Sequence, residues 1–267
     1  MSVKQRFRGI TNYAVYYGRG EAEALSHYDA VIVEPSGQSP ENVAQLRARG
    51  TLVLAYVSVV EIPEYDPLFA MLAEDDFMRD DEGRRMRNDT FGGHLADLSS
   101  VRWQGLLKHR IGKLLRLDGY DGVFFDTIGD LEWPNIPPSR YKGLLRNAGQ
   151  FVKSVRELHP DALLVQNNGL NALCEETAPW LDGICWENPD FTDKASSRWH
   201  AAVWLRLRML VQNHPITILL LNETDQTGPN DRFEHATRLA EQPGIVAYGA
   251  PPGYVGEVRM PINRKVE

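Results

Sequence analysis

Two acidic residues that directly follow apolar runs are the strongest candidates for chemistry in this chain. Asp126 ends the stretch 118–126, and Glu187 ends the stretch 182–187. Side chains alternate between the two faces of a β-strand, and here both faces are mostly apolar, which is typical of a parallel strand covered on both sides. An acid at the end of such a strand points into the space beyond the carboxyl edge of the sheet. A pair of carboxylates there can share nucleophilic and acid–base roles.

Three further acids end other apolar runs in the same way, at Glu34, Glu61 and Glu223. Carboxylates that converge on one edge of a sheet repel one another and resist desolvation, so a stable protein tends to avoid them unless they have a use. The alternative is that each acid simply faces solvent from a wet loop. That alternative suits Glu61 and Glu223 taken singly, whereas Glu34 fits either interpretation.

An aspartate lies five residues before three of these strand-end acids, at Asp29, Asp121 and Asp182. Because five is odd, the two acids of each pair lie on opposite faces and at opposite ends of their strand. The earlier acid then sits where a helix turns into the strand, and Asp is a common turn or cap residue. We predict structural roles for these three aspartates.

The chain repeats a β-rich run, a polar or glycine-bearing exit and a helical segment. Eight such runs occur, at 10–16, 30–33, 52–59, 118–126, 162–165, 183–186, 216–221 and 245–248. Helix signals between them include Ser39 as N-cap and Pro40 as the first residue of a helix over 40–49. Eight β/α units predict a single α/β domain over residues 1–267, a (β/α)8 TIM barrel. A doubly wound open sheet is the alternative, although its GxGxxG turn is not completed anywhere.

The segment 62–99 is the longest stretch between a run and the helix that follows it. It is charged and glycine-bearing, and we expect a short helix around 68–77 followed by an irregular stretch. The barrel is therefore expected to carry a long loop insertion after its third strand. Loops of this length on a regular frame are usually functional.

Composition limits the partners and the location. The formal net charge is -7 and the basic residues are scattered, which disfavours nucleic acid and suits a neutral or cationic substrate. No apolar stretch is long enough to span a bilayer, so we expect no membrane partner. The first residues lack the apolar core of a secretory signal, which favours a cytoplasmic protein; a protein whose leader had been removed would be secreted.

Signals for cofactors and metals are missing from the sequence. The two cysteines, Cys174 and Cys185, lack CxxC spacing, and we expect packing roles for them, with a bridge between them as the alternative. The histidines show neither HxxxH nor HExxH spacing, and no GxSxG marks a nucleophilic serine. We therefore expect no metal and no cofactor.

Aromatic and amide side chains gather at the exits of the runs. They are Tyr16, Tyr17, Tyr56, Trp133, Trp186, Tyr248, Tyr254, Asn167, Asn168 and Asn188. Taken singly, each ring is more often a packing residue than a binding platform. As a set beside carboxylates they favour an oligo- or polysaccharide substrate, because glycoside hydrolysis uses two carboxylates around the scissile bond.

Five segments together resemble glycoside hydrolase family 114. They are 52–65, 95–98, 120–127 (Tyr-Asp-Gly-Val-Phe-Phe-Asp-Thr), 166–169 and 183–188, in the order of the family and spread over most of the chain. That family is built around endo-α-1,4-polygalactosaminidases and related barrels. The resemblance implies a barrel that cleaves α-linked galactosaminoglycan with retention, in which Asp126 is the nucleophile and Glu187 the acid/base.

The resemblance also implies roles for residues around that pair. Asp97 matches the family's acid before the helix that precedes the fourth run, and Tyr56 and Glu61 match its third-run motif. With the other run ends included, the residues expected to contact substrate are Glu34, Tyr56, Glu61, Asp97, Trp133, Asn167, Asn168, Trp186, Glu223 and Tyr248.

Two other functional classes stay open at this point. In a carbohydrate-binding barrel without turnover, Asp126 and Glu187 would lie far apart or pair with Arg. A metal-assisted lyase or aldolase would use oxygen ligands from Glu34, Asp97, Asp126 and Glu223. Within the glycosidase hypothesis, carboxyl groups roughly 5 to 5.5 Å apart indicate retention, and roughly 6.5 to 9.5 Å indicates inversion.

Overall fold

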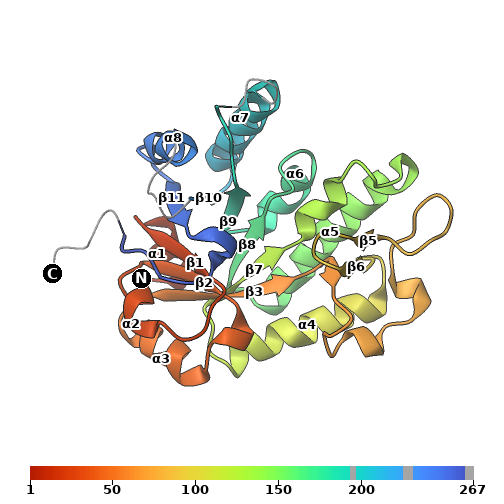
Figure 1. Ribbon diagram of the computed structural model, residues 1–267, viewed down its shortest axis with the longest axis horizontal. Helices are drawn as coiled ribbons and strands as arrows, with labels where there is room; N and C mark the ends of the chain where they lie inside the picture. The colour runs from red at the N-terminus through yellow and green to blue at the C-terminus, as the bar shows by residue number, and fades with distance from the viewer. Residues whose placement is uncertain (193–196, 225–230, 262–267) are drawn as a thin grey trace.

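The computed structural model describes residues 1–192, 197–224 and 231–261, and its centre is a barrel of eight parallel strands (Figure 1). In order around the barrel these are β1 (Tyr13–Tyr16), β2 (Ala30–Val33), β3 (Leu52–Ser58), β7 (Gly122–Asp126), β8 (Leu163–Asn167), β9 (Gly183–Glu187), β10 (Thr217–Glu223) and β11 (Ile245–Ala250). The order around the barrel is the order along the chain. The predicted (β/α)8 TIM barrel is confirmed.

The first and last strands of the sheet lie side by side and nearly close the barrel (Figure 1). The rings of Tyr13 on β1 and Tyr248 on β11 meet across this seam, with their centroids 5.7 Å apart. Beyond the strand ends, the backbone N–H of Tyr17 donates to the carbonyl of Tyr254 at 2.7 Å. These contacts join the first strand to the C-terminal part of the chain.

Helices cover the outside of the barrel (Figure 1). They are α1 (Val3–Arg8), α2 (Ala22–Leu25), α3 (Pro40–Ala48), α4 (Val101–Arg116), α5 (Pro138–Leu158), α6 (Leu173–Thr177), α7 (Ser197–Asn213) and α8 (Asp231–Leu239). The predicted helix over 40–49 occurs as α3, and the Ser39 hydroxyl accepts from the N–H of Asn42 at 3.2 Å as an N-cap should. The sequence pattern does not predict α1 and α6, because six and five residues are too few to show a helical period.

The segment between β3 and α4 contains a small antiparallel sheet, in which β4 (Glu61–Ile62), β6 (Gly93–Leu95) and β5 (Arg87–Asn88) pair in that order. The predicted helix over 68–77 is wrong. Two 3₁₀ turns, Phe69–Met71 and Glu74–Asp76, occupy the stretch instead. The backbone is extended at Ala73, whose N–H donates to the Asp76 carboxylate at 2.7 Å. This local hydrogen bond competes with a continuous helix.

Asp29, Asp121 and Asp182 connect the amino ends of neighbouring strands, and this confirms the structural roles predicted for them. Their carboxylates accept hydrogen bonds from backbone N–H groups near the starts of neighbouring strands, namely those of Thr11 (2.8 Å, to Asp29), Val53 (3.0 Å, to Asp121) and Leu164 (3.0 Å, to Asp182). Two of these acids also form ion pairs, Asp121 with Arg47 and Asp182 with Arg156. The acids at this end of the barrel therefore have partners for their charge.

Neither a disulfide nor a membrane-spanning helix is found among the described residues. Cys174 and Cys185 are buried free thiols, so a bridge between them does not form. Within the described ranges, none of the helices combines the length and the apolar composition needed to cross a membrane.

Replacing Asp182 by Ala is expected to destabilise the barrel. The Asp182 side chain is 6% exposed and that of Arg156 is 14% exposed, so the substitution removes a buried counter-charge and the acceptor of the Leu164 N–H. Breaking a buried ion pair costs about 3 to 5 kcal/mol. We expect about 2 to 3 kcal/mol, because Arg156 keeps hydrogen bonds to backbone carbonyls such as that of Ala162.

Urea unfolding measures this difference in the free energy of unfolding. The exposed Asp161 provides the control, and Asp161→Ala should change the free energy by less than about 0.5 kcal/mol. Equally small changes in both variants would contradict the role given to Asp182.

Candidate active site

Asp126, Asn167 and Glu187 end three neighbouring strands and share one face of the sheet. Strands β7, β8 and β9 are adjacent, and Asn167 is paired with Cys185, two residues before Glu187. Trp186 lies between Cys185 and Glu187 and stacks on His200 of α7, outside the barrel. Because neighbouring side chains on a strand point to opposite faces, Glu187 and its two companions point to the inside.

The amide of Asn167 bridges the two carboxylates. Its Nδ2 donates to Asp126 Oδ1 and to Glu187 Oε2, each at 2.7 Å. The two oxygens therefore lie no farther apart than twice that distance. The Asn167 side chain is 4% exposed and its Oδ1 accepts no hydrogen bond within the described chain, so the amide is held by the two bonds that it donates.

Three tyrosines complete a ring of contacts around the pair. The hydroxyl of Tyr254 donates to Glu187 Oε1, and the phenol of Tyr56 lies close to the Asp126 carboxylate. The ring of Tyr17 lies between the other two, with centroid distances of 5.0 Å to Tyr56 and 5.3 Å to Tyr254. Glu187 thus accepts from two side-chain amides, those of Asn167 and Asn168, and from one phenol, whereas Asp126 accepts from the Asn167 amide.

The environment of Glu187 raises its pKa above the ordinary glutamate value. Burial is the main cause, and the charges of Asp126 and Glu223 act in the same direction. The hydrogen bonds from Tyr254 and Asn167 stabilise the ionised form and partly oppose this rise. A carboxyl group with a raised pKa beside a second carboxylate is suited to donate a proton.

Two further acids meet beside this pair. Asp130, on the 3₁₀ turn Ile128–Glu132 that follows β7, lies close to Glu61 of β4. Burial and the Glu61 carboxylate raise the pKa of Asp130 to about 9, and the charges of Asp126 and Glu187 add to this effect. The sequence pattern does not predict a role for Asp130. Its only signal there is its place in an exit loop, four residues after Asp126.

No lysine or arginine of the described ranges forms an ion pair with Asp126, Glu187, Glu61 or Asp130. These four acids at the carboxyl end of the barrel are therefore a concentration of negative charge without a paired Lys or Arg among the described residues. This contrasts with the amino end, where Asp121 and Asp182 are paired.

A family model for glycoside hydrolases matches residues 4–197 of the chain, which is well over half of its length. The chain belongs to glycoside hydrolase family GH114. No curated protein sequence matches it closely enough to show a relationship.

Solved structures resemble the fold of this GH114 protein. The glycoside hydrolase domain of PelA from Pseudomonas aeruginosa has a TM-score of 0.74 and 22% sequence identity, covering 92% of this chain and 96% of that one. Aspergillus fumigatus Ega3, solved in complex with galactosamine, has a TM-score of 0.66 and 12% identity, covering 89% of each chain. An alpha-galactosidase from Thermus thermophilus also has a TM-score of 0.66, at 16% identity, covering 94% of this chain and 63% of that one.

In this GH114 barrel, residues with a left-handed backbone conformation follow the ends of β7, β8 and β9. They are Thr127 (φ 61°), Asn168 (φ 54°) and Asn188 (φ 50°). Each side chain reaches a neighbouring segment, where it accepts from the backbone N–H of Val60 (2.9 Å, to Thr127), Glu187 (3.1 Å, to Asn168) or Glu223 (2.8 Å, to Asn188). Asn tolerates this backbone conformation, whereas a β-branched Thr is strained in it. Asn168 is predicted to contact substrate. In the structure its side chain hydrogen-bonds Glu187 and thereby positions that residue.

Three residues predicted to contact substrate have partners within the protein. Glu223 Oε1 accepts from the N–H of Gly253 at 2.7 Å, which fixes the loop that carries Tyr254. Glu34 Oε1 accepts from the N–H of Ser36 at 3.2 Å, as a cap of the turn after β2. Asp97 is buried and forms an ion pair with Arg140 of α5.

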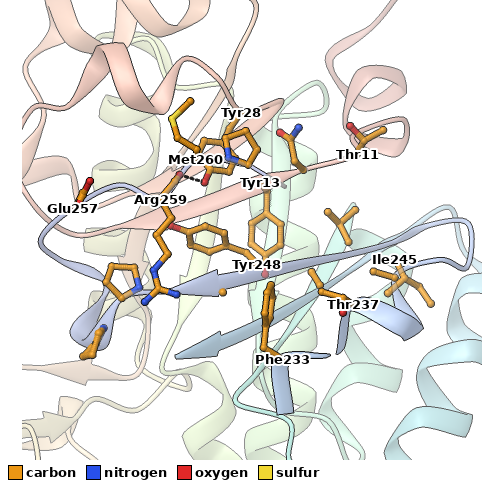
Figure 2. A pocket seen from close by; sticks show the side chains of 18 of the residues that line it. Thr11, Tyr13, Tyr28, Phe233, Thr237, Ile245, Tyr248, Glu257, Arg259 and Met260 are labelled. Atoms are coloured by element: carbon orange, nitrogen blue, oxygen red, sulfur yellow. Dashed lines mark hydrogen bonds between the residues drawn. The ribbon is translucent and has the colours of Figure 1, made fainter. Parts of the chain in front are cut away.

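The fold places the aromatic side chains that are predicted to contact substrate in separate parts of the barrel. Trp186 is 2% exposed and packs against α7, so its ring has no free face for a sugar. Tyr248 lies inside the seam between β1 and β11, with Tyr13 and Tyr28 each 5.7 Å away in centroid distance (Figure 2). Trp133 lies half-buried directly after the turn that carries Asp130. Of the four predicted rings, Tyr56 alone contacts one of the two carboxylates.

A cavity of about 920 Å³ lies along this seam, beside the tyrosine cluster and the segment near Met260 (Figure 2). Neither Asp126 nor Glu187 lines it. The cavity is therefore separate from the carboxylate pair.

No metal-binding site is found in the described part of the chain. No group of three or more His, Cys, Asp and Glu side chains there has an arrangement that could hold a metal ion. Two of the ligands considered for a lyase already have partners within the protein, Asp97 with Arg140 and Glu223 with the Gly253 backbone.

Asp130→Asn is expected to stabilise the folded protein, and more so as the pH rises. The unfolded Asp loses its proton near pH 3.9, whereas the folded carboxyl keeps it to about pH 9. Between these values the native state binds more protons than the unfolded state, so this group lowers stability as pH increases. Asn removes that penalty because it has no charge in either state.

The measurement is the free energy of unfolding of both proteins from about pH 5 to about pH 8. The advantage of Asp130→Asn should grow by roughly 1 kcal/mol for each pH unit. A difference that does not vary with pH would show that Asp130 is ionised in the folded protein.

Proposed function

We propose that this GH114 protein is a retaining hydrolase of α-linked amino-sugar polysaccharides, of the endo-α-1,4-polygalactosaminidase type. The observation that carries the proposal is the Asn167 amide, which holds Asp126 and Glu187 on one donor nitrogen with 2.7 Å bonds. Such a spacing suits direct attack by a carboxylate, for which roughly 5 to 5.5 Å between carboxyl groups is typical. It leaves little room for the water that an inverting enzyme places between carboxyl groups roughly 6.5 to 9.5 Å apart.

The two carboxylates have different roles in the first step. Asp126 attacks the anomeric carbon as an ionised nucleophile, while Glu187 gives its proton to the leaving glycosidic oxygen. The bond from the anomeric carbon to that oxygen breaks, and an ester to Asp126 forms. The raised pKa of Glu187 keeps the proton available for this transfer.

The second step returns the enzyme to its starting state. Glu187, now ionised, takes a proton from water, and the resulting hydroxyl attacks the anomeric carbon and releases Asp126. The Tyr254 and Asn167 hydrogen bonds stabilise the ionised Glu187 between the steps. Two displacements at the same carbon retain its configuration.

A cationic sugar is supported by the unpaired acids at the carboxyl end of the barrel. An excess of carboxylates attracts a positively charged polymer and repels an acidic one. The complex of Ega3 with galactosamine shows that a barrel of this shape accepts an amino sugar.

A carbohydrate-binding barrel without turnover is the second candidate. It would be favoured by carboxylates that are far apart or neutralised by arginine. Asp126 and Glu187 are instead joined by Asn167, and within the described residues neither forms an ion pair.

Asp126→Asn is expected to abolish turnover with the fold intact, because a neutral amide cannot form the glycosyl ester. Incubation with deacetylated and N-acetylated α-1,4-galactosaminan, with products read by mass spectrometry, should show cleavage by the unaltered protein and a loss of about 10³-fold or more in the variant. Asp161→Asn, an exposed change at the other end of the barrel, is the control. Release of fragments by Asp126→Asn at the normal rate would refute the assignment.

The anomeric form of the first product tests retention separately. NMR spectra recorded within the first turnovers should show the α-anomer before mutarotation. Detection of the β-anomer as the first product would show inversion of configuration and would contradict the double displacement.

Tyr254→Phe is expected to shift the alkaline limb of the pH profile of kcat/KM to higher pH. The Tyr254 hydrogen bond stabilises ionised Glu187 and lowers its pKa, so removing it raises that pKa further. Because the first step needs protonated Glu187, the active form then persists to higher pH. An unchanged alkaline limb would show that another group controls it. Tyr65→Phe, at an exposed ring, is the matched control.

A further inference from the structure

Glu223 ends β10, the strand next to the one that carries Glu187. In the pairing of β9 with β10, Leu221 is opposite Glu187, so Glu223 is two residues farther along and its side chain leaves the same face of the sheet. The backbone N–H of Glu223 donates to Asn188 Oδ1 at 2.8 Å, and the carbonyl of Leu221 accepts from the N–H of Asn188 at 2.6 Å. The place of Glu223 is therefore fixed by the sheet and by the residue that follows Glu187.

The turn that carries Tyr254 has an unfavourable backbone conformation. Gly253 and Tyr254 are successive residues with positive φ, 66° and 58°. Glycine adopts this conformation freely, whereas a bulky tyrosine does not, so contacts of the turn must hold it there. The N–H of Gly253 donates to Glu223 Oε1 at 2.7 Å. The carbonyl of Tyr254 accepts from the N–H of Tyr17, also at 2.7 Å.

The side chain that this turn presents reaches the candidate acid/base. The Tyr254 hydroxyl donates to Glu187 Oε1, and the Tyr254 ring lies 5.3 Å from that of Tyr17 in centroid distance. Tyr254 is 8% exposed, whereas Glu223 is exposed to solvent. Glu223 is thus the solvent-facing end of a connection that leads through the turn to Glu187, and it can be replaced without opening a cavity in the core.

We propose that Glu223 is a positioning residue, which holds the Gly253 N–H and thereby keeps the Tyr254 hydroxyl on Glu187. The inference rests on the proposed function, which gives Glu187 its role as acid/base. It differs from the substrate contact that the sequence predicts for Glu223, because the carboxylate then acts through the turn and does not touch the sugar.

Glu223 affects the pKa of Glu187 in two opposite ways. Its negative charge raises that pKa, and the Tyr254 hydrogen bond that it positions lowers it. Glu223→Gln removes the charge but keeps an oxygen that can accept from the Gly253 N–H. Glu223→Ala removes both the charge and the acceptor. The Ala variant should therefore have a higher Glu187 pKa than the Gln variant, because it alone loses the Tyr254 bond.

The other titratable and amide groups that interact with Glu187 are the same in both variants. They come from the end of β1, from β7 and the turn after it, and from β8 and β9, and they are Tyr17, Asp126, Asp130, Asn167, Asn168 and Cys185. A difference in the Glu187 pKa between the Ala and Gln variants therefore reports on the acceptor at position 223.

NMR titration of the protein labelled with ¹³C at its glutamate carboxyl groups measures the pKa of Glu187, whose resonance is the one missing from the Glu187→Gln spectrum. We expect the pKa in Glu223→Ala to exceed that in Glu223→Gln by about 0.5 to 1 pH unit, as loss of one hydrogen bond does. In the Tyr254→Phe background the two variants should agree, because no hydroxyl remains to be positioned. Glu41→Gln, at an exposed glutamate of α3, is the control and should leave the Glu187 pKa unchanged.

The inference is overturned if the Ala and Gln variants have the same Glu187 pKa, or if their difference persists in the Tyr254→Phe background. Urea unfolding verifies that both variants are folded. Kinetics on α-1,4-galactosaminan separates positioning from a substrate contact. A positioning role moves the alkaline limb of kcat/KM in the order found for the pKa, whereas a Glu223 carboxylate that bound a cationic sugar would raise KM equally in both variants and would contradict the inference.

Failure of this inference and failure of the proposed function give different results, because the NMR titration needs no turnover. A pKa difference that vanishes with Tyr254→Phe, in a protein that cleaves no α-glycan, would keep the connection from Glu223 to Glu187 and remove the hydrolase. Cleavage of galactosaminan with equal pKa values in the two variants would leave the hydrolase in place and remove the role of Glu223.

Discussion

The active end of this barrel depends on one amide between two carboxylates. Asp126 and Glu187 come from β7 and β9, and their charges would push them apart in a buried site. Asn167, on the strand between them, donates one hydrogen to each at 2.7 Å. A residue on the intervening strand is the shortest connection that the sheet order offers. The amide therefore sets both the spacing and the orientation of the pair.

Acidic residues have opposite environments at the two ends of the barrel. At the amino end, Asp121 and Asp182 cap backbone N–H groups and pair with arginines, so their burial stabilises the fold. At the carboxyl end, Asp126 and Glu187 approach each other without a paired cation among the described residues, and burial raises the pKa of Glu187. The first arrangement contributes stability, and the second reduces it. Protein sites that bind or react commonly show this pattern of perturbed acids.

Segments far from β7 and β9 in the sequence complete the site. Tyr254 reaches Glu187 from the C-terminal loop, and that loop is fixed by Glu223 and by the backbone of Tyr17. Glu61 arrives on β4, where the hydroxyl of Thr127 accepts from its N–H at 3.1 Å. The strained backbone of Thr127 is thus offset by hydrogen bonds that attach the small antiparallel sheet to the end of β7.

The sequence by itself determined the eight strands, the positions of Asp126 and Glu187, and the capping roles of the early aspartates, because each follows from strand length and the alternation of side chains. The same alternation already places Trp186 opposite Glu187, so its absence from the site could have been derived. Tertiary structure decided the rest. The raised pKa of Asp130, the positions of the Tyr17 and Tyr254 phenols, and the ion pair of Asp97 with Arg140 depend on distances between residues remote in the chain. Strand periodicity carries no information about such distances, and pKa values and hydrogen bonds are set by them.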